Sequence, residues 1–338
     1  MRIRHVTFKQ LQSIAIALAL FTISIFLVWS HNRILHTHSD HLSLRLQWIH
    51  QAQFAGFYVA REKGFYKDLN LDIDIEPGGS SFNVPTMVST GQADVGIWVA
   101  DQVLRGYGHA GMPIRAVGVV FRKSLVCFMV KKDSSILSPA DFRNRTIGVY
   151  PGFDSESIYT ELLGQFHISR QEVKEYPAAY SIVPFLSGQV DVWPAYIVNE
   201  PLAAIEHGQP VRCLSPDAFG IRYYSDTVIV KDEILAKRRD VVIRFLRASE
   251  MGWRYALSHP DEAVETVLKY DPSLKRDHER AMLLALAEYV SPTDPFFQMD
   301  PAVWKVMADQ LHAAGTIPDA SSVLGAIDYK AASEAHQP

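Results

Sequence analysis

TGQADV at residues 90–95 returns almost unchanged as SGQVDV at residues 187–192. Each copy follows an apolar run typical of a short helix and leads into a β-prone segment that contains Trp98 or Trp193. Glycine is the commonest residue just after a helix, so the motif is also typical of an ordinary helix-to-strand connection. The repetition favours one structural unit used twice, which predicts two similar α/β lobes with the functional groove between them.

Length and composition narrow the class of protein. The chain has 338 residues, of which 48% are hydrophobic and 21% charged. These values are ordinary for a globular protein and leave room for about two domains. The net charge is −4 and no block of basic residues occurs, which argues against a nucleic-acid partner. A small neutral or cationic ligand fits this chain better.

The first thirty residues differ from the rest. Residues 1–10 form a basic tip, and residues 11–29 carry no charge. A helix of that length just spans a hydrocarbon core of about 30 Å, and its positive flank predicts a cytoplasmic N-terminus. The residues that follow are unlike a signal-peptide cleavage site. We expect an uncleaved transmembrane signal anchor at 11–29, a tether at 30–43, and a folded domain outside the cytoplasm, in the periplasm.

Cys127 and Cys213 are the two cysteines of the chain. A pair in an exported protein could form a disulfide, but both residues stand in apolar, strand-like sequence, which favours two buried free thiols. Two cysteines this far apart do not make a metal site, and histidines of a tether have no neighbours to orient them. We expect no metal and no cofactor.

From residue 44 onward, strand-like and helix-like segments alternate. The expected strands are residues 44–48, 71–75, 94–98, 114–121, 125–131, 146–150, 191–195 and 227–230. Such alternation predicts a mostly parallel sheet with helices on both faces. The series begins anew after residue 131 and is shorter the second time. We expect lobe 1 at 44–131, a smaller lobe 2 inserted at 132–221, and the return of lobe 1 with C-terminal helices at 222–338.

No catalytic signature occurs in the chain. The sequence lacks G-x-S-x-G, H-E-x-x-H, a Walker loop, and G-x-G-x-x-G after a strand. PGGSS at residues 77–81 precedes a helix, so its backbone N–H groups and the Ser81 hydroxyl could face an anion. A serine-capped turn explains the same stretch equally well. We therefore expect no catalytic residues.

Aromatic residues recur at the predicted carboxyl ends of strands, which line the crevice of an open α/β sheet. Flat rings there can stack on a planar heterocycle, and a nearby carboxylate would favour a protonated or amino-bearing ring. Taken singly, each aromatic is also explained by core packing. The predicted ligand-binding residues are Trp48, Phe54, Tyr58, Ser81, Trp98, Gly152, Phe153, Asp154, Tyr196, Asn199 and Glu200.

The stretch WIHQAQFAGFYVAREKGFYKDLNLDIDI at residues 48–75 resembles the opening of the thiamine-pyrimidine, SsuA-like group of periplasmic binding proteins. The two Gly-Gln-x-Asp segments and YIVNEP at residues 196–201 share the likeness. This group holds solute receptors of ABC importers and thiamine pyrimidine synthases. The resemblance covers most of residues 44–270. It implies a two-lobed, type II periplasmic binding protein-like fold that closes on a pyrimidine precursor of thiamine.

The chain departs from the synthase branch at three places. Aligned on DVGI at residues 94–97, Trp98 stands where the synthases carry the lysine that holds pyridoxal phosphate. Gln102 replaces the histidine that they consume, and residues 221–225, at the place of their cysteine-rich run, contain no cysteine. Without an amine no Schiff base forms, so the resemblance argues against synthesis here.

These observations predict a membrane-anchored, extracytoplasmic solute-binding protein. It would capture a pyrimidine-type ligand and pass it to an ABC permease by closing about hinges near residues 125–132 and 220–230. A thiamine pyrimidine synthase is the enzymatic alternative, which product formed from pyridoxal phosphate and histidine would establish. A ligand-sensing receptor is the third, which a neighbouring kinase or cyclase gene would favour.

Overall fold

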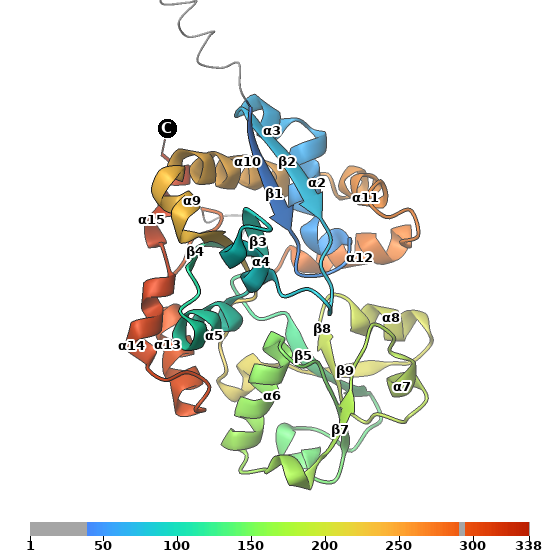
Figure 1. The fold of residues 1–338 in the computed structure, drawn as a ribbon. Helices are drawn as coiled ribbons and strands as arrows, with labels where there is room; N and C mark the ends of the chain where they lie inside the picture. Colours follow the sequence, from blue (N-terminus) through green and yellow to red (C-terminus); the bar gives the residue numbers. More distant parts are fainter. Residues whose placement is uncertain (1–38, 291–294, 338) are drawn as a thin grey trace, which may run out of the picture. The chain divides into compact units, whose positions relative to one another are not determined.

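The computed structural model describes residues 39–290 and 295–337. The predicted basic tip, the predicted anchor at residues 11–29 and most of the tether lie outside these residues. Within the described part of the chain, no helix is both long and apolar enough to cross a membrane. The described strands and helices from residue 41 onward belong to one unit, in which strands and helices alternate (Figure 1).

The larger sheet has five strands in the order β2-β1-β3-β10-β4. These are β1 (Asp40–Arg45), β2 (Leu71–Glu76), β3 (Val95–Val99), β4 (Ile114–Val119) and β10 (Asp226–Lys231). β1 runs parallel to β3, whereas β10 is antiparallel to both β3 and β4. The expectation of a mostly parallel sheet is therefore wrong at β10. This strand comes much later in the chain than its neighbours and enters the sheet from the opposite end.

The smaller strands repeat this order. β8 (Trp193–Tyr196), β5 (Val126–Lys131) and β9 (Val211–Leu214) form one sheet, and β6 (Thr146–Val149) pairs in parallel with β7 (Lys174–Pro177). A parallel bridge from Ile147 to Val192 places β6 beside the start of β8. The resulting order, β7-β6-β8-β5-β9, matches β2-β1-β3-β10-β4 strand for strand. β5, which the sequence assigned to lobe 1, hydrogen-bonds to β8 and β9.

Both copies of the repeated motif connect a helix to the third strand of this order. Gly91 ends α4 (Val84–Thr90) with φ +80°, and Gly188 follows α7 (Val183–Leu186) with φ +79°. Both glycines thus adopt the left-handed conformation that other residues rarely take. The chain then enters β3 in one case and β8 in the other, so the repeat marks equivalent positions.

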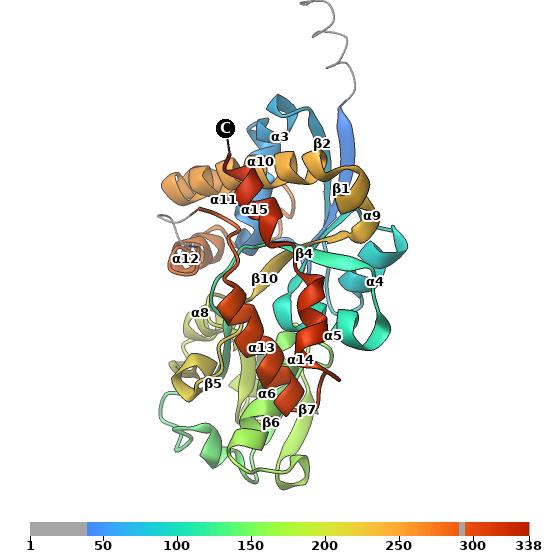
Figure 2. The same cartoon turned by 90° about the vertical axis from the view of Figure 1, so that its left-hand side faces the viewer.

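Helices cover the sheets on several sides (Figures 1 and 2). The remaining α-helices are α2 (Ala55–Glu62), α3 (Phe65–Asp68), α5 (Ala100–Ala110), α6 (Asp154–Gln165), α8 (Glu200–Glu206), α9 (Asp232–Lys237), α10 (Arg239–Ser258), α11 (Pro260–Leu268), α12 (Arg276–Leu286), α13 (Pro301–Ala313), α14 (Ala320–Val323) and α15 (Tyr329–Ala335). Short 3-10 turns are η1 (Ala52–Phe54), η2 (Pro139–Phe142), η3 (Arg170–Glu172), η4 (Pro216–Phe219) and η5 (Leu324–Ala326).

The helix pair α2 and α10 packs most closely. A Cβ atom on Gly252 would lie 2.0 Å from the carbonyl oxygen of Gly56, so only glycine permits this approach. Trp253 and Phe57 fill the space beside the contact, with ring centroids 6.0 Å apart. This packing fixes the loop between β1 and α2, which contributes to the candidate site below.

Cys127 and Cys213 are joined in a disulfide, so the prediction of two free thiols is wrong. They lie on β5 and β9, which are adjacent antiparallel strands, with Cα atoms 5.4 Å apart. Both cysteines stand in strand-like sequence, as expected, and the pairing of the two strands brings their sulfur atoms together. This pairing links residues 86 positions apart.

Candidate functional site

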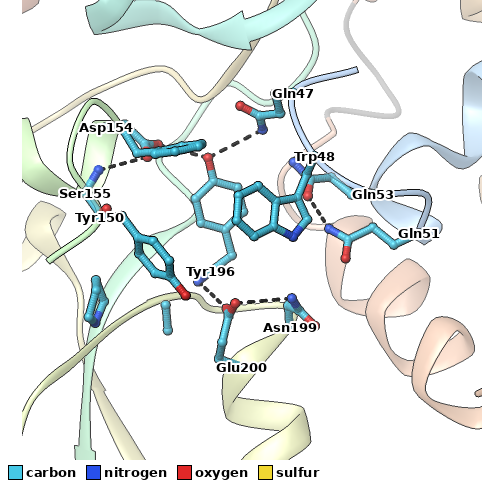
Figure 3. Close-up of a pocket in the computed structure, with 13 residues that line it drawn as sticks. Gln47, Trp48, Gln51, Gln53, Tyr150, Asp154, Ser155, Tyr196, Asn199 and Glu200 are labelled. Atoms are coloured by element: carbon cyan, nitrogen blue, oxygen red, sulfur yellow. Dashed lines mark hydrogen bonds between the residues drawn. The ribbon is translucent and has the colours of Figure 1, made fainter. Parts of the chain in front are cut away.

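A pocket of about 490 Å³, part of it open to solvent, lies at the carboxyl ends of three strands. Its walls are the loop after β1, the turn between β6 and α6, and the connection from β8 to α8 (Figure 3). Strands of both sheet systems therefore contribute. The lining residues are Gln47, Trp48, Gln51, Gln53, Tyr150, Phe153, Asp154, Ser155, Pro194, Ala195, Tyr196, Asn199 and Glu200.

Aromatic rings form one part of the pocket wall. The indole of Trp48 meets the Phe153 ring edge-on at 5.5 Å between centroids, and Tyr150 lies at 6.2 Å. The carbonyl of Trp48 accepts a 2.8 Å hydrogen bond from the backbone of Gly78. A Cβ on Gly78 would come within 2.0 Å of the Leu46 carbonyl oxygen, so glycine lets the two loops approach. The position of Trp48 is thus set by backbone contacts.

A second part of the wall is built on Asp154, which is 2% exposed. Its Oδ2 accepts a 3.1 Å hydrogen bond from the Tyr196 hydroxyl, and its Oδ1 accepts one of 2.8 Å from the Ser155 backbone. Burial, together with the nearby carboxylate of Asp101, raises the pKa of Asp154 well above its ordinary value. The described contacts of this carboxyl group are with neutral donors, so a ligand N–H would find an acceptor here.

Asp226 lies behind the loop after β1 and is 1% exposed. The side-chain amides of Gln47 and Gln53 donate to its two oxygens at 2.6 and 2.8 Å. Burial raises the pKa of Asp226 to about 7. Both glutamines line the pocket, so this carboxyl group orients the amides that a ligand would meet.

The start of α8 closes the pocket on the remaining side. Glu200 accepts a 2.8 Å hydrogen bond from the Tyr196 backbone through Oε2, and one of 3.3 Å from the Asn199 amide through Oε1. Burial raises the pKa of Glu200 to about 7. Near neutral pH this carboxyl group can therefore either accept or donate a proton in a hydrogen bond with a ring nitrogen or amino group.

The structure brings together six of the eleven residues predicted from the sequence. Trp48, Phe153, Asp154, Tyr196, Asn199 and Glu200 all line the pocket. Trp98 stands behind this wall, 4% exposed, with its ring 5.6 Å from that of Phe153.

The other four predicted residues lie elsewhere. Phe54 and Tyr58 are buried in the core that surrounds α2 and α10, because the loop after β1 turns them away from the pocket. Ser81 and Gly152 are exposed on neighbouring turns and do not line it. Within residues 39–290 and 295–337, no group of three or more histidine, cysteine or acidic side chains is arranged to hold a metal ion.

Sequence reasoning missed the glutamines and Asp226. Gln51 and Gln53 stand within the quoted stretch at residues 48–75, where polar residues between a strand and a helix signal a loop at the sheet edge. Gln51 donates to Gln53 at 2.6 Å, so the pair acts together. Asp226 directly precedes the apolar run at residues 227–230. A carboxylate entering a central strand is the signal that could have identified it.

Known proteins share this fold. The solved structure of the periplasmic aliphatic sulphonate binding protein SsuA from Escherichia coli matches with a TM-score of 0.65 at 15% identity, over 86% of this chain and 92% of that one. At this identity the likeness shows the fold alone, which is an α/β periplasmic-binding-protein-like fold.

Relatives at the sequence level include two binding proteins. A formylaminopyrimidine-binding protein from Halalkalibacterium halodurans is 22% identical over 281 residues, which are 80% of this chain and 84% of that protein. The riboflavin-binding protein RibY from Chloroflexus aurantiacus is 25% identical over 243 residues, 68% of this chain and 66% of that protein. The family model described as NMT1/THI5 like matches residues 51–263, more than half of the chain, and the protein therefore belongs to this family.

Proposed function

We propose that this protein is an extracytoplasmic solute-binding protein that captures a small aromatic, pyrimidine-type precursor of thiamine for an ABC importer. The pocket carries the proposal, because aromatic rings stand there beside carboxyl groups whose partners are neutral. A flat ring with amino groups fits such walls, since one aromatic ring can pack on its face and another can meet its edge, while its N–H groups donate to carboxyl oxygens. Formylaminopyrimidine, for which one relative is named, has this chemistry.

The proposed mechanism is closure of two lobes on the ligand. The larger sheet and the helices around it would form the first lobe, and the sheets of β5 to β9 with α6 to α8 would form the second, in a type II arrangement with hinges near 125–132 and 220–230. A ligand that touches both lobes stabilises the closed state, which is how it shifts the population. The 3.0 Å hydrogen bond from the Ser80 backbone to the Tyr180 hydroxyl supports such closure beside the pocket.

We also propose that residues 11–29 form a single-pass anchor in the cytoplasmic membrane, with the folded part of the chain on the periplasmic side. The partner would be an ABC permease in that membrane, and the protein would need no nucleic acid and no cofactor. The charge-free length of the segment supports this reading.

Binding is favoured over synthesis by the residues around β3. The position that the resemblance equates with the synthase lysine holds Trp98, whose ring contacts Phe153. The thirteen residues that line the pocket include no lysine, so no amine is placed there for a Schiff base with pyridoxal phosphate.

A thermal-shift series on the full chain in detergent micelles tests the proposal. Formylaminopyrimidine, riboflavin, an aliphatic sulfonate and pyridoxal phosphate would be compared. A ligand present at 100 times its Kd adds about 2.7 kcal/mol of stability. We expect stabilisation by formylaminopyrimidine above the others. Stabilisation by the sulfonate or by riboflavin, with none by the pyrimidine, would assign a different ligand.

A further inference from the structure

His278 connects α12 to the start of α8, directly behind the pocket. Its side chain is 12% exposed. The ring nitrogen Nε2 lies 2.9 Å from Oδ1 of Asn199, and Nδ1 lies 2.7 Å from Oε1 of Glu206. Asn199 lines the pocket, whereas His278 does not. The histidine therefore reaches the candidate site only through another residue.

Both partners of this imidazole are hydrogen-bond acceptors. The Asn199 amide nitrogen donates to Glu200, which leaves its oxygen toward His278. The Glu206 carboxylate is an acceptor as well. The pKa of Glu206 is lowered: burial alone would raise it, but the hydrogen bond with His278 lowers it. A neutral imidazole has one N–H and can satisfy only one of these acceptors, whereas the imidazolium has two.

The contact also orders the pocket wall. Asn199 is the first residue before α8, and its side chain does not cap the helix. It is held between His278 and Glu200 instead, and Glu200 in turn accepts from the Tyr196 backbone. The result is one chain of hydrogen bonds from Glu206 through His278, Asn199 and Glu200 to the pocket.

We propose that His278 is a positioning residue for ligand binding, which in its doubly protonated form fixes Asn199 and Glu200 in the geometry that the ligand meets. The ligand is the one of the proposed function, on which this inference rests. Binding is then strongest when both ring nitrogens carry protons, because the loss of either proton leaves Asn199 or Glu206 without a donor.

Charged groups on both helices face this imidazole. α8 contributes the carboxyl groups of Glu200 and Glu206, and α12 contributes that of Glu279. Lys275 stands just before α12, and its Nζ lies 3.5 Å from Oε2 of Glu206. Its ammonium group therefore competes with His278 for the Glu206 carboxylate. Three carboxyl groups thus oppose one ammonium group around His278.

Calorimetric titration of the full chain in detergent with formylaminopyrimidine, from pH 5.5 to 8.5, tests the inference. His278→Gln should weaken binding about tenfold at pH 6, since the glutamine amide does not reproduce the two donors of the ring at Asn199 and Glu206. It should also reduce the decline of affinity with rising pH to the part that Glu200 contributes, so that the two proteins converge at pH 8.5. His207→Gln is the matched control, because His207 is exposed at the other end of α8. An unchanged pH profile in His278→Gln would overturn the proposal.

Two further measurements separate the possible causes. Burial raises the pKa of Glu200 to about 7, so this group titrates within the pH range of the experiment. Glu200→Gln isolates its contribution, because the decline that depends on His278 should persist in that variant. NMR of the ligand-free protein needs no ligand, so it survives failure of the proposed function. Both ring N–H protons of His278 should be visible at pH 6, shielded from exchange by their hydrogen bonds. If only one of them is present, the inference fails even where the pyrimidine binds.

Discussion

Asp94 and Asp191 make the same hydrogen bond in two different sheets. Oδ2 of Asp94 accepts the backbone N–H of Ser43 at 2.8 Å, and Oδ2 of Asp191 accepts that of Thr146 at 2.8 Å. Each carboxylate stands shortly before the third strand of the shared strand order, β3 or β8, and holds the second strand, β1 or β6, in register. The aspartate of the repeated Gly-Gln-x-Asp motif thus joins two neighbouring strands by a hydrogen bond. It does not line the pocket.

Removing either carboxylate should therefore lower stability and spare the binding site. A hydrogen bond to a charged group contributes about 1.5 to 3 kcal/mol, and we expect losses of that size from Asp94→Ala and from Asp191→Ala. Urea unfolding measures the free energy of each variant. Asp72→Ala, at an exposed position of β2, is the control and should change it by less than about 0.5 kcal/mol. Equal losses in all three variants would contradict this role.

Replacing Trp48 should weaken ligand binding without unfolding the protein. Its indole contacts Phe153, Tyr150 and Tyr180 at the pocket wall. Trp48→Ala removes the largest flat surface there, and we expect a loss in affinity of about ten- to a hundredfold, with Trp48→Phe retaining part of it. Calorimetry with formylaminopyrimidine gives the affinities. Phe82→Ala changes an exposed aromatic outside the pocket and should bind like the wild type.

The sequence predicts the order of the strands and helices and about half of the residues that line the pocket, because both depend on local sequence patterns. Trp48 and Phe153 follow strands and Tyr196 ends one, and the strands of each sheet system end at a common edge, so the pattern places these residues at such edges. That the edges of the two sheet systems meet is a property of the whole fold. Phe54 and Tyr58 follow the same strand but occupy a helix whose apolar face turns to α10, which no local pattern reveals. The disulfide is likewise decided by strand pairing, because β5 and β9 are far apart in the chain.

Asp226→Asn should stabilise the protein above neutral pH. The pKa of Asp226 is raised to about 7 in the folded state, so the folded protein holds this proton more tightly than the unfolded chain does. That preference stabilises the fold at low pH and is lost as the pH rises from about 4 to about 7. Asparagine carries no charge, so the gain should appear at pH 8, on the order of a few kcal/mol, and vanish at pH 4. Thermal melts across this range measure it.

The same substitution tests whether Asp226 serves binding. Gln47 and Gln53 both donate to this carboxyl group, and asparagine offers only one acceptor oxygen for two amides. We expect weaker pyrimidine binding alongside the higher stability, a trade-off common at functional sites. Asp72→Asn should change neither property. A variant that is more stable and binds normally would show that the carboxylate has no part in recognition.

Loss of the Cys127–Cys213 disulfide should destabilise the protein. The bond closes a long loop, since the two cysteines are 86 positions apart in the sequence. Constraining a loop of this size in the unfolded chain contributes about 2 to 5 kcal/mol. Cys127→Ala with Cys213→Ala should lower the urea midpoint by a corresponding amount. Reductant should lower the wild-type midpoint in the same way and leave that of the double variant unchanged, which serves as the internal control.

Ser157 should govern the rate of ligand release. This buried serine lies on α6, and its Oγ accepts hydrogen bonds from Gln102 at 3.1 Å and from Arg105 at 3.0 Å, both on α5. α5 follows β3 of the larger sheet and α6 follows β6 of the smaller one, so these bonds cross between the proposed lobes. Neither hydrogen bond involves a residue that lines the pocket. Without them, the closed state should open more often.

Ser157→Ala should therefore raise the dissociation rate about tenfold and leave the association rate nearly unchanged, because closure follows encounter. Stopped-flow tryptophan fluorescence can follow both rates, since Trp48 lies in the pocket and Trp98 behind it. Ser187→Ala, at an exposed turn, is the control and should alter neither rate. A slower association with unchanged dissociation would place the effect of Ser157 on the encounter step and contradict a role in holding the lobes closed.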